Sequence, residues 1–404
     1  MKDNQAKYPQ LRFKGFTDPW EERKFFESIA STIDFRGRTP KKLGMDWSDS
    51  GYLALSALNV KNGYIDPLAD AHYGDEKLYR KWMSGRELKK GQVLFTTEAP
   101  MGNVAQVPDD NGYILSQRTV AFETKEDMMT NDFLAVLLKS PLVFNNLSAL
   151  SSGGTAKGVS QKSLKGLSIT VPLDIDEQQK IGSFFKQLDD TITLHQRKLA
   201  KLKELKQGYL QKLFPKNGSK FPQLRFAGFA DAWEQRKLKQ LVKSRDKDRI
   251  PIESGKRQAG KYPYYGATGI VDHVKDYIFE GTYLLLAEDG ANILDRTHPI
   301  SYVVNGRFWV NNHAHTFQSS QGTDLTFLAE SLERIHYQRY NTGTAQPKLN
   351  AKVVGKIEVL CPTSNEQRKL GKLSYLIDVL IAANQRKLEK LQELKKGYLQ
   401  KMFC

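Results

Sequence analysis

An internal duplication constrains this chain more than any other feature of its sequence. The segment KYPQLRFKGFTDPWEERK at residues 7–24 returns as KFPQLRFAGFADAWEQRK at residues 220–237. The basic segment QRKLAKLKELKQGYLQKLF at residues 196–214 returns as QRKLEKLQELKKGYLQKMF at residues 385–403. Between these landmarks each copy carries a variable stretch and then the tripeptide GTA, at residues 154–156 and 343–345. The 404 residues therefore predict two units of one plan, each with a PQLRF segment, a variable domain, a GTA loop and a helix.

Each copy ends in a segment that has the signals of a long helix. An acidic or hydroxyl residue followed three residues later by Glu, at 174–177 and at 363–366, is the capping-box pattern of a helix start. Pro215 stops the first helix, because proline cannot continue the backbone hydrogen bonding. The first helix is therefore expected from about residue 175 to residue 214, and the second from about residue 364 to the end of the sequence.

Apolar residues recur along both helices at spacings of three and four, whereas Lys and Arg fill the remaining faces. This pattern predicts a coiled-coil seam in which the first helix pairs with the second. The predicted parts of the chain are a first domain at residues 1–173, a helix at 174–214, a linker at 215–219, a second domain at 220–362 and a helix at 363–404.

The two variable stretches differ from each other in sequence. Both contain short runs of strand-forming residues, such as VLFTT at 93–97 and YLLLA at 283–287, divided by Gly, Asn and Asp turns. The predicted fold class is α+β, with two α/β domains and two long antiparallel helices that form a coiled coil with internal pseudo-two-fold symmetry.

The net charge of +16 favours a polyanionic partner, and nucleic acid is the leading candidate. The amino terminus lacks the apolar core of a signal peptide, and no apolar run approaches the roughly 20 residues that span a bilayer. We therefore expect a cytoplasmic protein. With two cysteines in the whole chain, a disulfide framework or a multi-thiolate metal site is not expected.

Three weak signals of catalysis or metal binding are present. The run GGTAKGVS at residues 153–160 resembles a phosphate-binding loop, but Val159 stands where that loop needs a lysine. Asp109, Glu123 and Lys125 match the loose pattern of magnesium nucleases. The pair at 313–315, HAH, would suit a metal if a third ligand lay close in sequence, and none stands at a recognisable spacing.

Taken together, the motifs resemble the specificity subunits of type I restriction-modification enzymes over essentially the whole chain. The resemblance rests on the repeated PQLRF-x-GF segments, on VLFTTEAPMGNVAQV at 93–107 followed by SQR, and on YPYYGATG at 262–269. It rests further on EQQKI and EQRKL at the helix starts and on the GYLQK endings.

The resemblance implies a chain without an active site. It implies two target-recognition domains that each read one half of a split double-stranded DNA sequence, held by two antiparallel helices. Such a chain recruits two modification (methyltransferase) subunits, and restriction (motor-nuclease) subunits join for cleavage. S-adenosylmethionine, ATP and magnesium would be held by those partners. A helix over residues 176–214 would be roughly 58 Å long, which exceeds the roughly 34 Å between major-groove faces one DNA turn apart, so the helices would set the spacer between the half-sites.

Residues that read or hold DNA are expected to be Arg, Lys, Asn, Gln and hydroxyl or aromatic side chains in the two domains. The candidates in the first domain are Arg36, Arg38, Lys41, Lys42, Ser56, Asn59, Thr97, Gln117 and Arg118, with a phosphate loop from Gly154 to Lys157. Those in the second domain are Lys256, Arg257, Tyr264, Tyr265, Thr268, Arg296, Asn311, Asn312, His313 and Lys348. Aromatic residues at repeated positions, Trp20, Trp233, Tyr209 and Tyr398, are candidates for binding the partner subunits, although packing within the chain would explain them equally.

Two hypotheses of other classes stay open at this point. One is a self-sufficient magnesium-dependent nuclease that uses Asp109, Glu123 and Lys125. The other is a coiled-coil adaptor that makes no contact with DNA.

Overall fold

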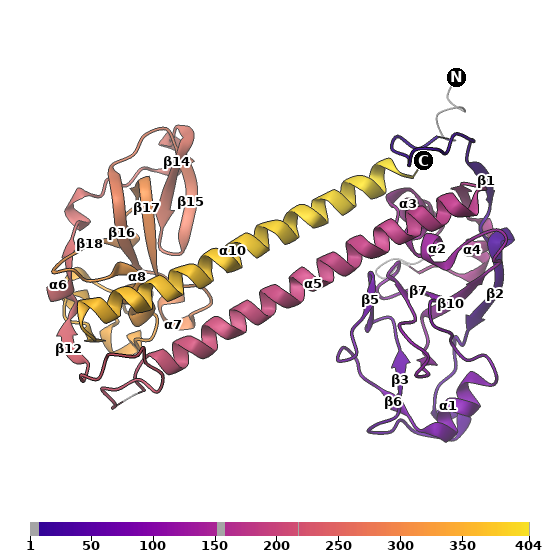
Figure 1. The fold of residues 1–404 in the computed structure, drawn as a ribbon, viewed down its shortest axis with the longest axis horizontal. Coiled ribbons are helices and arrows are strands. Elements are labelled where there is room, and N and C mark those ends of the chain that lie inside the picture. The colour runs from indigo at the N-terminus through magenta and orange to yellow at the C-terminus, as the bar shows by residue number, and fades with distance from the viewer. Residues whose placement is uncertain (1–7, 152–157, 217, 404) are drawn as a thin grey trace. The chain divides into compact units, whose positions relative to one another are not determined.

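A computed structural model describes residues 8–151, 158–216 and 218–403, and the chain divides into two compact units (Figure 1). Residues 1–196 and 386–404 form the first unit, and residues 197–385 form the second. Both boundaries fall between the Gln and the Arg of a QRKL sequence, at the same point of the duplicated helix. Each unit therefore contains one variable domain, the first part of one long helix and the last part of the other.

The long helices are α5 (Ile175–Leu213) and α10 (Ser364–Lys401), which confirms the two helices predicted from the sequence. Asp174 accepts the backbone N–H groups of Asp176 at 2.8 Å and of Glu177 at 3.3 Å, and so caps α5. The Glu177 carboxylate does not complete the predicted capping box, because it binds Arg12 instead. The division into domains at residues 173, 214, 219 and 362 stays a prediction.

The first unit is built from short strands in several small sheets. Its largest sheet has the order β2-β10-β7-β8 and is antiparallel throughout. Strand β1 pairs with β11, β4 with β5, and a three-stranded sheet has the order β6-β3-β9. The strands are β1 (Glu21–Lys24), β2 (Ile29–Asp34), β3 (Tyr52–Leu55), β4 (Val60–Lys61), β5 (Tyr64–Ile65), β6 (Tyr73–Gly74), β7 (Val93–Thr96), β8 (Val104–Gln106), β9 (Ile114–Leu115), β10 (Thr119–Thr124) and β11 (Ser168–Val171).

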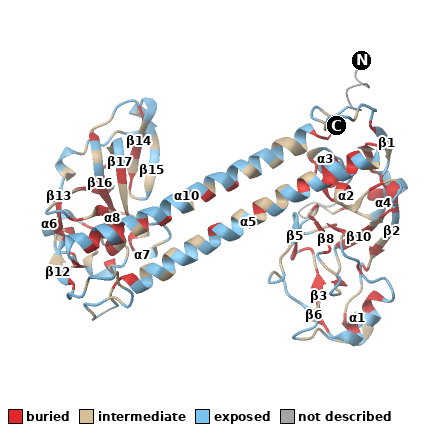
Figure 2. Cartoon of the chain, in the orientation of Figure 1, coloured by how far each residue is buried: buried red, intermediate tan, exposed pale blue. Residues whose placement is uncertain are grey.

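Helices cover these sheets and close two apolar cores in the first unit. One core joins β7 and β10 to the helix pair α2 and α3 and to the ends of both long helices, and the other lies between α1 and the three-stranded sheet. Figure 2 shows α2 largely buried. The helices are α1 (Glu76–Met83), α2 (Asn131–Leu137), α3 (Pro141–Leu150), α4 (Gln161–Gly166) and the 3₁₀ turns η2 (Phe25–Ser28) and η3 (Lys41–Leu43).

The second unit contains one six-stranded sheet of order β13-β18-β16-β17-β14-β15, and β12 pairs with β19 outside it. All pairs in the large sheet are antiparallel except β14 with β17, which is parallel. The strands are β12 (Glu234–Lys237), β13 (Val242–Ser244), β14 (Ala259–Gly266), β15 (Gly269–Val274), β16 (Phe279–Ala287), β17 (Ser301–Val310), β18 (Ala314–Ser319) and β19 (Glu358–Cys361).

One face of this sheet packs on α8 (Leu325–Leu332), whose Phe327, Leu328 and Leu332 are fully buried. A smaller aromatic core around Phe279 and Phe308 lies between β16, β17 and β14. The remaining helices are α6 (Leu238–Leu241), α7 (Asn292–Asp295), α9 (Ala351–Val354) and the 3₁₀ turns η4 (Asp246–Asp248), η5 (Ser254–Lys256) and η6 (Tyr337–Tyr340).

In the first unit, the PQLRF segment fastens the end of one long helix to the start of the other. The Leu11 N–H donates to the carbonyl oxygen of Lys401 at the end of α10, at 2.9 Å. The Arg12 guanidinium binds both oxygens of Glu177 near the start of α5, each at 2.7 Å. The two helices therefore run antiparallel here, and an ion pair between Lys395 and Asp189 joins them further along.

The second unit repeats this arrangement at the equivalent residues. The Leu224 N–H donates to the carbonyl oxygen of Lys212 at 2.9 Å, and Arg225 binds both oxygens of Glu366, each at 2.8 Å. Two-point contacts of this kind hold an arginine and a carboxylate in a fixed orientation. The PQLRF motif therefore makes the same two contacts in each copy, and these contacts fix the position of one helix end against the start of the other helix.

Among the residues that the structure describes, no single helix is long and apolar enough to cross a membrane. Helices α2 and α3 pass such a test only as a pair, and the pair is bent by 68°.

Candidate nucleic-acid interface

In the first unit, three loops bring predicted DNA-binding residues together. The side-chain amide of Gln117, which precedes β10, donates to the carbonyl oxygen of Arg38 at 2.6 Å. The Thr97 N–H donates to the carbonyl oxygen of Arg118 at 2.8 Å, and the Arg118 guanidinium pairs with Glu98 at 3.2 Å. The loop after β2, the turn after β7 and the segment before β10 therefore meet at one place, which we call the first basic cluster: Arg36, Arg38, Lys41, Lys42, Gln117 and Arg118.

Most cations of the first basic cluster are exposed. Arg36 faces Asp34 at 3.5 Å, and the Lys42 ammonium donates to the carbonyl oxygen of Gly37 at 2.7 Å. Arg38 is different, because its guanidinium lies 4.3 Å from the centre of the Phe35 ring and donates to the carbonyl oxygen of Trp82. Burial, with the nearby charge of Arg86, lowers the pKa of Arg38. Arg38 is thus a fixed part of the cluster, whereas Arg36, Lys41, Lys42 and Arg118 are exposed to solvent.

Other first-unit candidates lie outside this surface. Asn59 and Thr97 are buried, and the Asn59 amide donates to the carbonyl oxygen of Ala54 at 2.6 Å, so neither side chain is exposed at the surface. Ser56 donates to Asp70 at 2.8 Å. The predicted phosphate loop, Gly154 to Lys157, lies outside the described residues.

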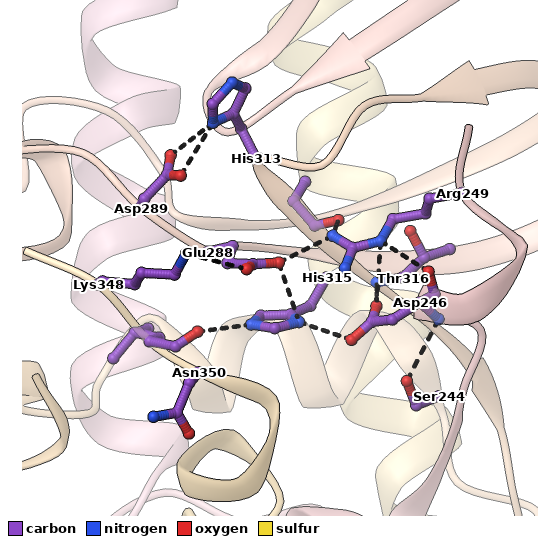
Figure 3. Close-up of polar contacts among 12 residues, drawn as sticks. Ser244, Asp246, Arg249, Glu288, Asp289, His313, His315, Thr316, Lys348 and Asn350 are labelled. Carbon is purple, nitrogen blue, oxygen red and sulfur yellow. Dashed lines mark hydrogen bonds and ion pairs between the residues drawn. The ribbon is translucent and has the colours of Figure 1, made fainter. Parts of the chain in front are cut away.

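In the second unit, candidates gather at the turn between β17 and β18. The Asn311 N–H donates to the carbonyl oxygen of Tyr265 at 3.0 Å, which places the turn beside the β14–β15 hairpin and its exposed Thr268. The imidazole Nδ1 of His313 lies 2.8 Å from Asp289 (Figure 3). Asp289 also forms a backbone bridge with Lys348. We call this group the second polar cluster: Tyr265, Thr268, Asn311, Asn312, His313 and Lys348.

The side chains of the second polar cluster differ in how far they are exposed. Asn312, His313 and Lys348 reach solvent, and Lys348 faces Glu288 at 3.6 Å. Asn311 is nearly buried and its side-chain oxygen accepts the His313 N–H at 2.8 Å, so it shapes the turn. Tyr265 packs edge-on against Phe308, and burial raises its pKa.

The remaining second-unit candidates have structural partners. Tyr264 is fully buried, and its hydroxyl accepts the Ile252 N–H at 3.0 Å, so it belongs to the core. Arg257 lies over the Tyr264 ring and pairs with Asp272 at 3.2 Å, while Lys256 is exposed beside Glu253. Arg296 binds Glu333 of the α8 end at 2.7 Å, which makes it a link between α7 and α8.

Among the described residues, the carboxylates and histidines of the weak catalytic signals have partners of their own. Asp109 accepts hydrogen bonds from Tyr113 and from the Asn111 N–H, whereas Glu123 accepts one from Ser31, so the two carboxylates have separate partners. His313 and His315 likewise bind different carboxylates, those of Asp289 and Asp246. In the described part of the chain, no three His, Cys, Asp or Glu side chains are grouped so that they would hold a metal ion.

Of the two explanations for Trp20 and Trp233, the structure favours packing within the chain. Both are 1% exposed, and each packs edge-on against a phenylalanine at the end of a long helix, Phe403 and Phe214 respectively. The repetition of these tryptophans therefore reflects a repeated core, in which each one packs between the end of a long helix and a short helix of its domain, Phe133 of α2 or Phe327 of α8. Tyr398 packs on Phe184 within the first unit, and Tyr209 remains partly exposed.

Sequence reasoning missed two sets of residues that organise these surfaces. The first set is Arg12 and Arg225, which bind the buried Glu177 and Glu366. Both arginines lie in the repeated PQLRF motif, so the repeat was a signal that could have identified them. The second set is the group of partly buried charges beneath the His313 turn, which includes Asp246, Arg249 and Glu288. No sequence signal marked this group, because its members come from distant segments.

Comparison with known proteins adds independent information. The family described as the type I restriction modification DNA specificity domain matches the chain twice, at residues 28–204 and 230–393. Each match covers one variable domain and most of the helix that follows it.

Two curated relatives are type I restriction enzyme specificity subunits. One, a putative subunit from Haemophilus influenzae, is 33% identical over 134 residues, which span about a third of either chain. The other, from Methanocaldococcus jannaschii, is 25% identical over 70% of this chain and 72% of its own length.

Among solved structures, the S subunit of a type I restriction-modification system from M. genitalium has a similar fold. The TM-score is 0.71 at 17% identity, over 98% of this chain and 99% of that one. This likeness confirms the predicted fold class, two α/β domains with two long helices.

Proposed function

The chain belongs to the type I restriction-modification DNA specificity family, and we propose that each of its units reads one half of a bipartite double-stranded DNA target. The specificity subunits of this family act without an active site of their own, so the proposed chemistry on DNA is assigned to partner subunits. The observation that carries the proposal is the contrast between constant and variable parts. Both units share the PQLRF contacts and the helix pairing, whereas their polar clusters come from different strands and loops and have different compositions.

The two clusters have the composition that DNA recognition needs. Exposed Arg and Lys of the first basic cluster suit guanine edges and phosphates, and Asn312, His313 and Lys348 of the second polar cluster offer donors and acceptors to base edges. The surplus of basic residues in the chain, +16 overall, supports a salt-dependent attraction to the DNA backbone. Different residues on a common plan would give two different half-sites.

The proposal includes partners that carry out the reactions. Two methyltransferase subunits would modify adenine, and motor-nuclease subunits would join them for cleavage, with S-adenosylmethionine, ATP and magnesium bound by those subunits. The proposed spacer between the half-sites is set by α5 and α10.

The direct test is to sequence the methylated bases of cells that express this chain with its cognate modification subunit. We expect methylated adenines within one split motif with a constant spacer. Absence of any new methylated motif, although the complex assembles, would contradict the proposal. Cleavage of DNA by the purified chain with magnesium alone would favour a nuclease instead.

Arg118 provides a test at the level of one unit. Replacement of Arg118 by Ala should weaken binding to the first half-site, by about 1 to 3 kcal/mol if the residue contacts a base. Competition binding with DNA altered in one half-site at a time measures this. The matched control is Arg80→Ala, which removes an exposed arginine of the same unit from its pair with Glu76 on α1 and should leave binding unchanged.

A further inference from the structure

A network of charged side chains lies beneath the His313 turn in the second unit (Figure 3). His313 is exposed, but His315 two residues later is only 1% exposed. Asp246 of η4 lies 2.7 Å from Nδ1 of His315, and Glu288, which follows β16, lies 3.7 Å from the same nitrogen. Arg249 joins these carboxylates, at 3.6 Å from Asp246 and 2.9 Å from Glu288.

Both ring nitrogens of His315 face hydrogen-bond acceptors. Nε2 lies 2.7 Å from the backbone carbonyl oxygen of Leu349, which has no proton to donate, so Nε2 must carry one. Nδ1 faces the Asp246 carboxylate, whose other oxygen accepts the Thr316 N–H at 2.8 Å. The Thr316 N–H and the Arg249 guanidinium also face Asp246, as hydrogen-bond donors face an anion. With a carboxylate opposite Nδ1, the geometry points to a proton on that nitrogen as well.

The Leu349 carbonyl belongs to the segment at residues 341–350, which carries Lys348 of the second polar cluster. This segment is tied to the loop after β16, because the Leu349 N–H donates to the carbonyl oxygen of Glu288 at 2.7 Å. The Gly290 N–H donates to the carbonyl oxygen of Pro347 at 3.0 Å. His315 thus joins three separate parts of the unit through one ring: η4, strand β18 and the segment that presents Lys348.

We propose that His315 is a buried imidazolium that positions the Lys348 segment and the His313 turn, and that loss of its proton weakens reading of the second half-site. The inference rests on the proposed function, because it assigns a positioning residue to one of the two DNA-reading units.

The sign of the effect follows from the groups that face the ring. Asp246 and Glu288 are the anions, Arg249 and Lys348 the cations, and the Asp289–His313 pair lies at the surface above them. A neutral ring turns a lone pair toward either Asp246 or the Leu349 carbonyl, so one contact becomes repulsive. Affinity for DNA should therefore fall as pH rises. The first domain has one histidine, His72, which is exposed beside Asp70, so the effect should be confined to the second half-site.

The protonation state has a direct measurement that does not depend on DNA. In the full chain labelled with ¹⁵N-histidine, NMR at about neutral pH should show one ring in which both nitrogens have a bonded proton protected from exchange. These signals should vanish in the His315→Gln variant. A single protonated nitrogen on His315 would overturn the proposal.

The functional measurement is the affinity of the assembled complex for its target between about pH 6 and about pH 9. We expect roughly a tenfold loss across this range, because hydrogen bonds to charged groups are the strong ones. His315→Gln should bind weakly at all pH values with a flat profile. His313→Gln should keep the pH dependence, which separates the buried ring from the exposed one, and His72→Gln should match the unaltered chain.

Two comparisons separate positioning from unfolding. Near-ultraviolet circular dichroism should show the second unit folded over the whole pH range, and a loss of affinity that only follows its unfolding would overturn the positioning role. DNA with a scrambled second half-site should show no pH dependence, whereas DNA with a scrambled first half-site should retain it. If the complex binds no specific DNA at any pH, the proposed function fails, while the NMR result still decides the state of the ring.

Discussion

At the scale of single residues, the chain places charged groups where they have no access to water. Glu177 is fully buried and Glu366 almost so, and each depends on one arginine of a PQLRF motif for a charged partner. A buried carboxylate that loses its cation is strongly destabilised, because desolvation of the charge is no longer offset.

Replacement of Arg12 by Met should therefore destabilise the first unit by about 3 to 5 kcal/mol. The equivalent Arg225→Met should do the same to the second unit, and the double change Arg12→Met with Glu177→Gln should recover part of the loss. Urea unfolding followed by tryptophan fluorescence measures the effect, because Trp20 lies in the affected core. Arg80→Ala, at an exposed pair, should cost less than about 1 kcal/mol. Equal costs for Arg12 and Arg80 would contradict this account.

Two glycines at equivalent positions of α5 and α10 allow a neighbouring helix to approach. A Cβ on Gly182 would lie 2.7 Å from Cβ of Asp132 and 2.9 Å from the backbone nitrogen of Phe133. A Cβ on Gly371 would lie 2.1 Å from Oδ1 of Asp324, which caps α8. These contacts are shorter than van der Waals distances, and in the Gly182 case backbone atoms have to move.

Gly182→Ala should destabilise the first unit by about 1 to 3 kcal/mol, as expected for overpacking. Gly208 supplies the matched control, because it lies in the same helix with nothing within 4 Å of a Cβ. Gly208→Ala should stabilise the chain by up to about 1 kcal/mol, since alanine favours a helix more than glycine does. Thermal unfolding of both variants tests the contrast, and a stabilised Gly182→Ala variant would show that the helices do not pack as described.

At the scale of elements, the two units use the same interhelical ion pair in opposite surroundings. In the first unit, Asp189 of α5 forms ion pairs with two lysines. One is Lys395 of α10, and the other is Lys139 at the end of α2, whose Nζ lies 3.0 Å from Oδ2 of Asp189. In the second unit, Lys206 of α5 is shared by Asp378 of α10 and Glu330 of α8, both at 2.8 Å. The residue that forms two ion pairs is thus an anion, Asp189, in the first unit and a cation, Lys206, in the second.

Asp189→Asn should therefore cost more stability than Asp378→Asn. The first change removes the carboxylate that Lys139 and Lys395 share, and burial already lowers the pKa of Lys139, so we expect a loss of about 3 kcal/mol. The second change leaves Lys206 with Glu330, and Asp378 is half exposed, so about 1 kcal/mol is expected. Unfolding of each variant in urea gives the two values, and the reverse order would exclude this explanation.

The sequence predicted the elements better than it predicted their neighbours. Proline, capping residues and the spacing of leucines are local signals, so α5 and α10 could be located from them. The parallel pairing of β14 with β17 and the burial of Trp20 depend on contacts between distant parts of the chain. From the sequence alone, Trp20 could lie in an interface or in a core. Its contact with Phe403, near the other end of the chain, decides for the core. For the same reason Arg36 and Arg118 could be proposed from their type, whereas His315 could not, because its role comes from Asp246 and Leu349.

At the scale of the whole molecule, the duplication produces two units that share the PQLRF contacts and the helix pairing but differ in the domain each one carries. Both unit boundaries fall within the helices, between residues 196 and 197 and between residues 385 and 386. The helices are continuous through these points. Under the proposed function, the length of α5 and α10 then decides the distance between the half-sites, independently of either polar cluster.

Insertion of seven residues into both helices at these two points tests this separation of roles. Seven residues preserve the phase of the seam and add about 10 Å of rise, which corresponds to roughly three base pairs. We expect the methylated motif to keep both half-sites and to gain a longer spacer, measured by sequencing methylated DNA. Lys201→Ala, an exposed change in the same region that alters no length, should leave the spacer unchanged. New half-sites with an unaltered spacer would mean that the helices take part in reading the sequence, because a purely mechanical spacer cannot change which bases are recognised.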